Sequence, residues 1–159
     1  MINAKKCDAS IPQDELIAYA KEYLKKRGYK KKNKRWTKDV GDFTLCFYIQ
    51  GSVYGGGVYY IRPGVFINGL DASRHGYGHF FTQLASETPE QVLRDFEEFA
   101  REWSDKKLIR ERVAAFLEWE KRNPLEKRRA GEVDYEKDPP PAELFGTDEC
   151  VLAYVMEHY

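Results

Sequence analysis

The stretch of sequence that decides the fold is FTLCFYIQ, residues 43–50. Large apolar side chains recur at every second position, which is the period of a β-strand that buries one face. The side chains expected to face the core are Phe43, Leu45, Phe47 and Ile49. The alternate set, expected on the other face, is Thr44, Cys46, Tyr48 and Gln50. This second set is mixed in polarity, so the sheet is predicted to have an outer face that is not purely polar.

The flanking segments extend this strand into a predicted antiparallel meander over residues 29–84. Asp39 and Gly41 favour a hairpin turn between a first strand, residues 29–38, and the stretch just described. Three consecutive glycines, residues 55–57, indicate a flexible connection after it.

A further strand is predicted over residues 58–67, although it contains Pro63. Because proline has no N–H to donate to a neighbouring strand, we expect an edge, a bulge or a break at that position. The segment HFFTQL, residues 79–84, predicts a short last strand. The sheet is therefore expected to contain three to four strands.

An N-terminal helix is predicted over residues 10–28. Ser10 is expected to cap its first turn, with Gln13 reaching back, and Pro12 fits a turn whose N–H groups have no partner inside the helix. Gly28 supplies the left-handed residue that commonly ends a helix.

The C-terminal half is predicted to be mainly helical. A helical pair is expected over residues 88–122, beginning at Thr88 and Pro89. Residues 125–146 are charged and rich in proline, which indicates a surface loop, and residues 147–159 predict a terminal helix. The whole pattern predicts an α+β fold in a single domain, residues 1–159, with the C-terminal helices packed on one face of the sheet.

Composition limits the class of protein without naming a chemistry. The chain has 159 residues, of which 42% are hydrophobic and 33% charged, and its formal net charge is zero. These values exclude a wholly disordered chain, and no apolar run reaches the roughly 20 residues that span a bilayer. Three widely spaced cysteines and the absence of an apolar secretory signal favour reduced thiols and a cytoplasmic location.

Several short motifs resemble the bacterial domain-of-unknown-function family 4304. They are LKKRGYKKK at 24–32, RW at 35–36, FYIQGS at 47–52, YYI at 59–61 and GVF at 64–66. Small bacterial domains of this kind are similar to immunity proteins, which bind and neutralise a cognate toxin and catalyse nothing. The resemblance therefore implies a binding protein whose partner is a protein toxin.

The residues offer little for catalysis or metal binding. His75 and His79 lie close together in sequence, but Asp71 is the only carboxylate near them, and a zinc site needs three or four ligands. Cys46 lies on a strand with no basic residue in its alternating row, so its thiol is expected to stay protonated and inert. We therefore expect no enzyme activity, no cofactor and no metal; a hydrolase that uses His75 or His79 is the weakest of the hypotheses.

The leading hypothesis is a non-catalytic immunity protein that occludes the active site of its toxin. An acidic segment with a central tyrosine suits a basic cleft, and aromatic or basic residues on glycine-flanked loops suit a protein interface. The partner-binding candidates are Tyr54, Arg74, His75, Tyr77, Glu132, Asp134, Tyr135, Glu136 and Asp138.

An alternative hypothesis is an RNA-binding accessory domain. A basic strip, which begins at Lys25 and ends at Arg35, has eight cationic residues among eleven and is followed by Trp36. Cations can follow phosphates while rings stack on bases. A lysine-rich helix end and a charged edge strand explain the same residues without nucleic acid.

Overall fold

The computed structural model describes residues 11–52, 57–71, 76–144 and 146–159. The chain divides into two compact units, which we call unit 1 (residues 1–104) and unit 2 (residues 105–159). The organisation as a single domain stays a prediction. None of the helices in the described ranges is long and apolar enough to cross a membrane.

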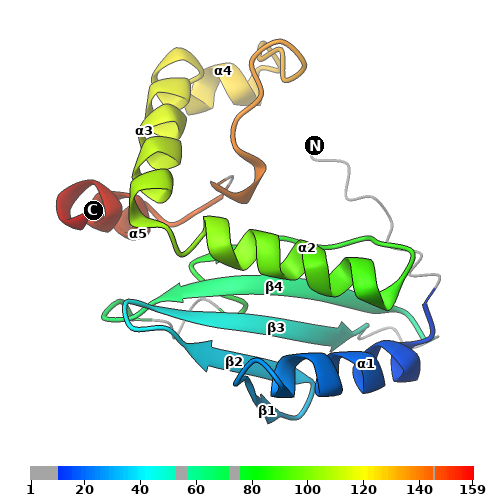
Figure 1. Ribbon diagram of the computed structural model, residues 1–159. Coiled ribbons are helices and arrows are strands. Elements are labelled where there is room, and N and C mark those ends of the chain that lie inside the picture. The colour runs from blue at the N-terminus through cyan, green and yellow to red at the C-terminus, as the bar shows by residue number, and fades with distance from the viewer. Residues whose placement is uncertain (1–10, 53–56, 72–75, 145) are drawn as a thin grey trace. The chain divides into compact units, whose positions relative to one another are not determined.

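Unit 1 combines two helices with an antiparallel sheet whose five strands lie in chain order. Its elements are α1 (Gln13–Lys25), β1 (Lys30–Lys32), β2 (Arg35–Asp39), β3 (Phe43–Gly51), β4 (Tyr59–Ile67), β5 (Phe80–Phe81) and α2 (Pro89–Glu102). α1 and α2 pack against each other and run along the sheet (Figure 1). The predicted α+β fold is confirmed, with one more strand than the largest number expected.

The additional strand arises from a tight hairpin within the basic strip. Lys32 of β1 pairs with Arg35 of β2, and Asn33 between them has a φ of 58°. Asparagine tolerates this left-handed conformation better than most residues, because its short side chain can bond locally. Residues 29–38, expected as one strand, therefore form two, and Asn33 was the signal for the turn.

The alternation of residues 43–50 is confirmed by burial. Phe43, Leu45, Phe47 and Ile49 are all buried. We call this the inner face of the sheet. The Phe47 ring lies 5.1 Å from that of Phe96 on α2, and the Trp36 ring lies 5.8 Å from that of Phe47. This aromatic cluster attaches α2 to the middle of the sheet.

The expectation of an edge, bulge or break at Pro63 is wrong. β4 is continuous, lies between β3 and β5, and places Pro63 opposite Phe47. The Pro63 carbonyl accepts from the N–H of Thr82, 3.1 Å away, on the β5 side. The nitrogen of a strand residue points to the same side as its carbonyl, so the missing N–H faces the two-residue strand β5 and leaves the β3–β4 ladder intact.

The helix ends follow local chemistry in part. α1 begins at Gln13 with Pro12 as its N-cap and no side-chain cap, and the predicted cap Ser10 lies outside the described residues. Thr88 caps α2 as predicted, with its hydroxyl oxygen accepting from the N–H of Gln91 at 3.3 Å. Glu97 of α2 then binds α1, because it accepts from the Tyr23 hydroxyl and Arg27 Nε, both at 2.6 Å.

Unit 2 contains α3 (Lys106–Arg122), α4 (Leu125–Arg129), the 3-10 turn η1 (Ala142–Leu144) and α5 (Glu149–His158). Residues 125–146, predicted as a surface loop, thus include two short helical segments, and Leu144 is fully buried. Asp138 anchors this part of the chain to α3. Its carbonyl accepts from Trp119 Nε1 at 2.6 Å, and its carboxylate accepts from Arg122 Nη2 at 2.9 Å.

The segment after β4 crosses the sheet at Gly64, on the face opposite to the helices. A Cβ atom at Gly64 would lie 1.6 Å from the carbonyl oxygen of Tyr77 and 2.7 Å from its carbonyl carbon. A real Cβ atom cannot approach backbone so closely, so a side chain at position 64 would displace this segment. Glycine is required at position 64 because the Tyr77 backbone leaves no room for a Cβ atom, and not because the residue has a positive φ.

We expect the substitution Gly64→Ala to destabilise the protein by about 1–3 kcal/mol or more, because the backbone at Tyr77 would have to move. Urea unfolding followed by circular dichroism measures this change. Gly51→Ala is the matched control, since a Cβ at Gly51 meets nothing within 4 Å. It should change the free energy of unfolding by less than about 0.5 kcal/mol. Equal effects of the two substitutions would contradict the close approach.

A second prediction concerns acid. Hydrogen bonds from Arg122 and then Asn123 hold the pKa of the Asp138 carboxyl below its ordinary value of 3.8. Because the pKa is lower in the folded state, this carboxylate stabilises the protein above its unfolded pKa, and the contribution is lost as pH falls through the folded pKa. Asp138→Asn should therefore lower the thermal midpoint at pH 7, and its difference from wild type should shrink toward about pH 3. Glu132→Gln is the control, and a difference independent of pH would count against the assignment.

Candidate binding surface

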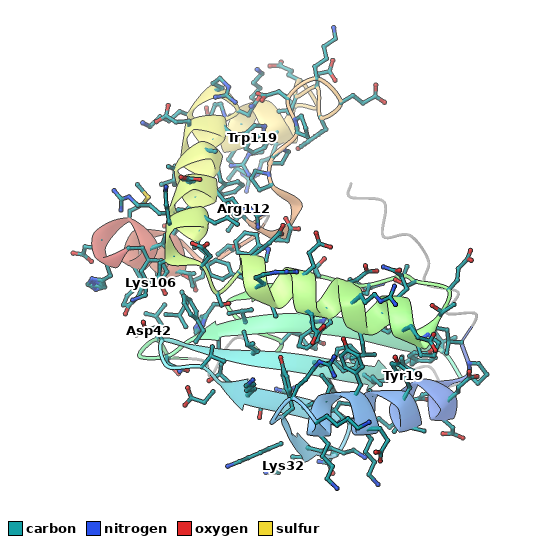
Figure 2. All side chains as sticks on the ribbon, viewed as in Figure 1. Tyr19, Lys32, Asp42, Lys106, Arg112 and Trp119 are labelled. Atoms are coloured by element: carbon teal, nitrogen blue, oxygen red, sulfur yellow. The ribbon has the colours of Figure 1, made fainter. Side chains whose placement is uncertain are left out.

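The side of the sheet opposite to the inner face, which we call the outer face, carries a line of cations around a tyrosine. Strand register places Lys32 opposite Arg35, Arg35 opposite Tyr48, and Tyr48 opposite Arg62. Directly opposed residues point to the same side of a sheet. One line across four strands therefore reads Lys-Arg-Tyr-Arg, and we call it the cationic row. Lys32 lies at its end, on the edge strand β1 (Figure 2).

Planar groups pack against one another along the cationic row. The Arg35 guanidinium lies 4.6 Å from the centroid of the Tyr48 ring, and the Tyr77 ring stacks on that ring at 6.0 Å. The Arg62 guanidinium lies 4.8 Å from the Tyr77 ring and 5.2 Å from the Tyr60 ring. Such contacts restrict long side chains that would otherwise sample many rotamers.

Gln50 fixes the position of the two groups on the far side of Tyr48. Its side-chain oxygen accepts from Arg62 Nε and from the Tyr77 hydroxyl, both at 2.9 Å. One amide oxygen therefore connects β3, β4 and the segment that crosses Gly64. Arg35 and Tyr48 are thus held by stacking, and Arg62 by both stacking and a hydrogen bond.

On the outer face, the pair of residues next to Tyr48 and Arg62 is covered by the backbone at Tyr77. Cys46 pairs with Gly64, and the backbone at Tyr77 lies over this position. His79 is 3% exposed, and its Nδ1 accepts from the N–H of Ile67 at 2.8 Å. Burial raises the pKa of the Cys46 thiol to about 11. Cys46 and His79 are thus buried on this side of the sheet, whereas Arg35, Tyr48 and Arg62 of the cationic row are half-buried.

The basic strip is divided between the two faces of the sheet. Trp36 is 1% exposed on the inner face, and the Tyr29 ring packs edge-on against that of Phe96 at 5.8 Å. Lys30 and Lys32 are exposed on the outer face. Lys31, by contrast, is paired with Trp36, and its Nζ lies 5.4 Å from the centroid of that ring. The rings expected to stack on bases are thus packed against α2 and the core, away from Lys30 and Lys32.

The structure describes six of the nine predicted partner-binding residues, and these six are divided between the two units. Tyr54, Arg74 and His75 lie outside the described residues. Tyr77 is half-buried and contacts the cationic row. The remaining five lie in unit 2.

The acidic segment of unit 2 forms an ordered turn against α3. The Tyr135 ring is 40% exposed and lies 6.1 Å from that of Trp119, which Figure 2 labels. The Asp134 carboxylate accepts from the backbone N–H groups of Glu136 and Lys137. Two of the predicted acidic contacts are therefore occupied within the protein, Asp134 in this turn and Asp138 by Arg122, whereas the Glu132 and Glu136 residues are exposed.

Sequence reasoning missed Arg35, Tyr48, Gln50 and Arg62 as members of one surface. The alternation within residues 43–50 placed Tyr48 and Gln50 on the outer face, and an equal alternation in β4 would have placed Arg62 there. Their alignment depends on strand register, and the position of Tyr77 depends on a contact with a residue 27 positions away. No local signal carries that information.

Within the described ranges, no three His, Cys, Asp or Glu side chains are grouped so that they could hold a metal ion. Nucleophilic catalysis requires a reactive group that an adjacent base or a lowered pKa activates. The Cys46 thiol does not meet this requirement, because its pKa of about 11 keeps it protonated near neutral pH.

Comparison with known proteins gives one match. Residues 20–79 match the family model described as Domain of unknown function (DUF4304). The resemblance predicted from the motifs is therefore confirmed over this range. The match runs from within α1 to His79 and includes every residue of the cationic row as well as Tyr77. No curated protein and no solved structure matches the chain.

The two described cysteines should differ in reactivity. Cys150 is exposed and Cys46 is buried with a pKa of about 11. With a maleimide reagent at neutral pH, Cys150 should be labelled in the folded protein and Cys46 only after denaturation, as peptide mass mapping would show. Labelling of Cys46 in the folded protein at the rate of Cys150 would contradict its assignment as an inert thiol.

Proposed function

We propose that this protein is a non-catalytic immunity protein of the cytoplasm, which binds a cognate protein toxin and occludes its active site. The observation that carries the proposal is the cationic row, in which half-buried arginines flank a half-buried tyrosine. Tyrosine and arginine are the residues, with tryptophan, that most often dominate the energy of protein interfaces.

The rigidity of this surface supports a binding role. Arg62 and Tyr77 share the oxygen of Gln50, and Arg35 stacks on Tyr48. Ordering long side chains costs roughly 0.5–1.5 kcal/mol each when a complex forms. Where they are already held in place, that cost is smaller and more of the contact energy appears as affinity.

The acidic segment of unit 2 provides a second proposed contact. Glu132, Glu136 and the partly exposed Tyr135 present negative charge beside an aromatic ring. Carboxylates of this kind suit the basic cleft of an enzyme that acts on nucleic acid or nucleotides, and they increase the rate of association by electrostatic steering.

RNA binding is the second candidate function, favoured by Lys30, Lys32 and Arg35 on one face. Its weakness is that Tyr29 and Trp36, the rings within and beside the basic strip, pack toward α2 and the core. A protein partner accounts for the same cations without needing those rings.

The proposal is tested by co-expression with the tagged product of the adjacent coding sequence. The two proteins should copurify at micromolar concentration, the complex should protect cells from the toxin, and the recovered toxin should have an unaltered mass. Failure of the wild-type protein to form this complex would refute the proposed function.

A point substitution locates the contact. Tyr48→Ala should weaken the complex at least about tenfold, because a tyrosine at the centre of an interface commonly contributes more than 1 kcal/mol. Tyr19→Ala is the matched control, since Tyr19 is also half-buried and stacked on a second tyrosine, but lies on α1. Isothermal titration calorimetry measures both, and equal losses would place the contact elsewhere.

A further inference from the structure

The faces of the Tyr48 ring in the cationic row, and of the neighbouring Tyr77 ring, are already in contact with other side chains. The Tyr48 ring is contacted by the Arg35 guanidinium from β2 and by the Tyr77 ring, which reaches it from the segment over β4. The Tyr77 ring is also contacted by Arg62, and lies 5.9 Å from the ring of Phe81. A base or another ring could stack on Tyr48 or Tyr77 only by displacing these partners.

What the row presents to a ligand is therefore a set of hydrogen-bond donors. A guanidinium has five N–H groups in one plane, and Arg62 uses its Nε–H on Gln50. Among the described residues, neither Arg35 nor Arg62 forms an ion pair. The exposed ammonium groups of Lys30 and Lys32 extend the same surface across β1.

Charge on the strand residues of this face is almost all of one sign. The carboxylate among these strand residues is Asp39, at the far end of β2, which accepts from the N–H of Gly41 at 2.9 Å and from Asn68 Nδ2 at 3.3 Å. Four cations, Lys30, Lys32, Arg35 and Arg62, thus face outward with this single, internally bonded carboxylate. The complementary ligand is an anion with several charges.

We infer that the cationic row binds an acidic segment of a protein, whose carboxylates pair edge-on with the Arg35 and Arg62 guanidinium groups. The inference rests on the proposed function and names the chemistry of the partner's contact. A carboxylate matches the planar fork of arginine with two parallel hydrogen bonds. Single-stranded nucleic acid is held by phosphate contacts together with base stacking, and the ring faces of Tyr48 and Tyr77 that stacking would use are occupied.

The geometry also sets the spacing of the acidic groups. Arg35 and Arg62 lie on β2 and β4, on either side of Tyr48. Strands are roughly 4.8 Å apart, so the two arginine backbones are separated by about 10 Å. Two carboxylates separated by two turns on one face of a helix, at positions i and i+7, span a similar distance of about 10.5 Å.

Defined probes test the inference with the full-length protein. Fluorescein-labelled decaglutamate, decaglutamine and decauridylate are titrated at low salt and followed by fluorescence anisotropy. Decaglutamate should bind at least tenfold more tightly than either of the others. Tighter binding of decauridylate would assign the row to nucleic acid instead, and equal or undetectable binding of the two peptides would overturn the inference.

Substitutions assign the binding to the row. Arg35→Gln and Arg62→Gln should each weaken decaglutamate binding at least tenfold, and Arg35→Lys should have an intermediate effect, because lysine keeps the charge but loses the fork. Lys21→Gln, on the exposed surface of α1, is the control for loss of one charge and should have little effect. Circular dichroism confirms that each variant is folded, and insensitivity to both arginine substitutions would overturn the inference.

The two proposals fail separately. If wild-type protein captures the toxin but the Arg35→Gln and Arg62→Gln variants capture it equally well, the acidic-segment inference is wrong and the proposed function stands. If decaglutamate binds through both arginines but the toxin is not captured, the proposed function is wrong.

Discussion

The crossing of the outer face by the backbone at Tyr77 is the constraint on which the binding surface depends. The crossing is possible because Gly64 has no side chain, and a Cβ there would overlap the Tyr77 carbonyl group. This contact brings the Tyr77 ring onto Tyr48 and its hydroxyl to Gln50. Cys46 and His79 are buried on the same side of the sheet.

An open sheet face usually carries mobile polar side chains, whereas the part of this face around Tyr48 is organised. Stacking and one shared amide oxygen hold Arg62, Tyr77 and Tyr48 in place. This organisation has one effect that favours binding and one that limits it. Side chains that are already fixed lose less entropy on association. Their stacked ring faces, however, are not available to a ligand, which can contact only ring edges and charged groups. The chemistry of the partner follows from what is left exposed.

The two units carry different candidate binding surfaces. Unit 1 offers the cationic row, and unit 2 offers exposed glutamates beside Tyr135. The acidic turn is built around α3, because the Asp138 carbonyl accepts from Trp119 and its carboxylate from Arg122. Asp138 therefore supports the shape of that surface, while Glu132 and Glu136 supply its free charge. A segment expected as a solvated loop has become a structured element.

The sequence by itself determined the elements and the face on which most side chains lie. A period of two in residues 43–50 is a local property, because adjacent strand residues must point in opposite directions. The cap at Thr88 is equally local, since it needs a hydroxyl within reach of the next turn. Even the missed hairpin at Asn33 had a local signal.

Only the tertiary structure decided which outer-face residues act together. The alignment of Arg35, Tyr48 and Arg62 depends on register between three strands, and a shift by one residue would send each to the other face. β4 accommodates Pro63 because the missing N–H lies on the side of the short strand β5 and not on the side of β3. Tyr77 reaches the row through a close approach to Gly64, and contacts between residues distant in sequence leave no periodic trace along the chain.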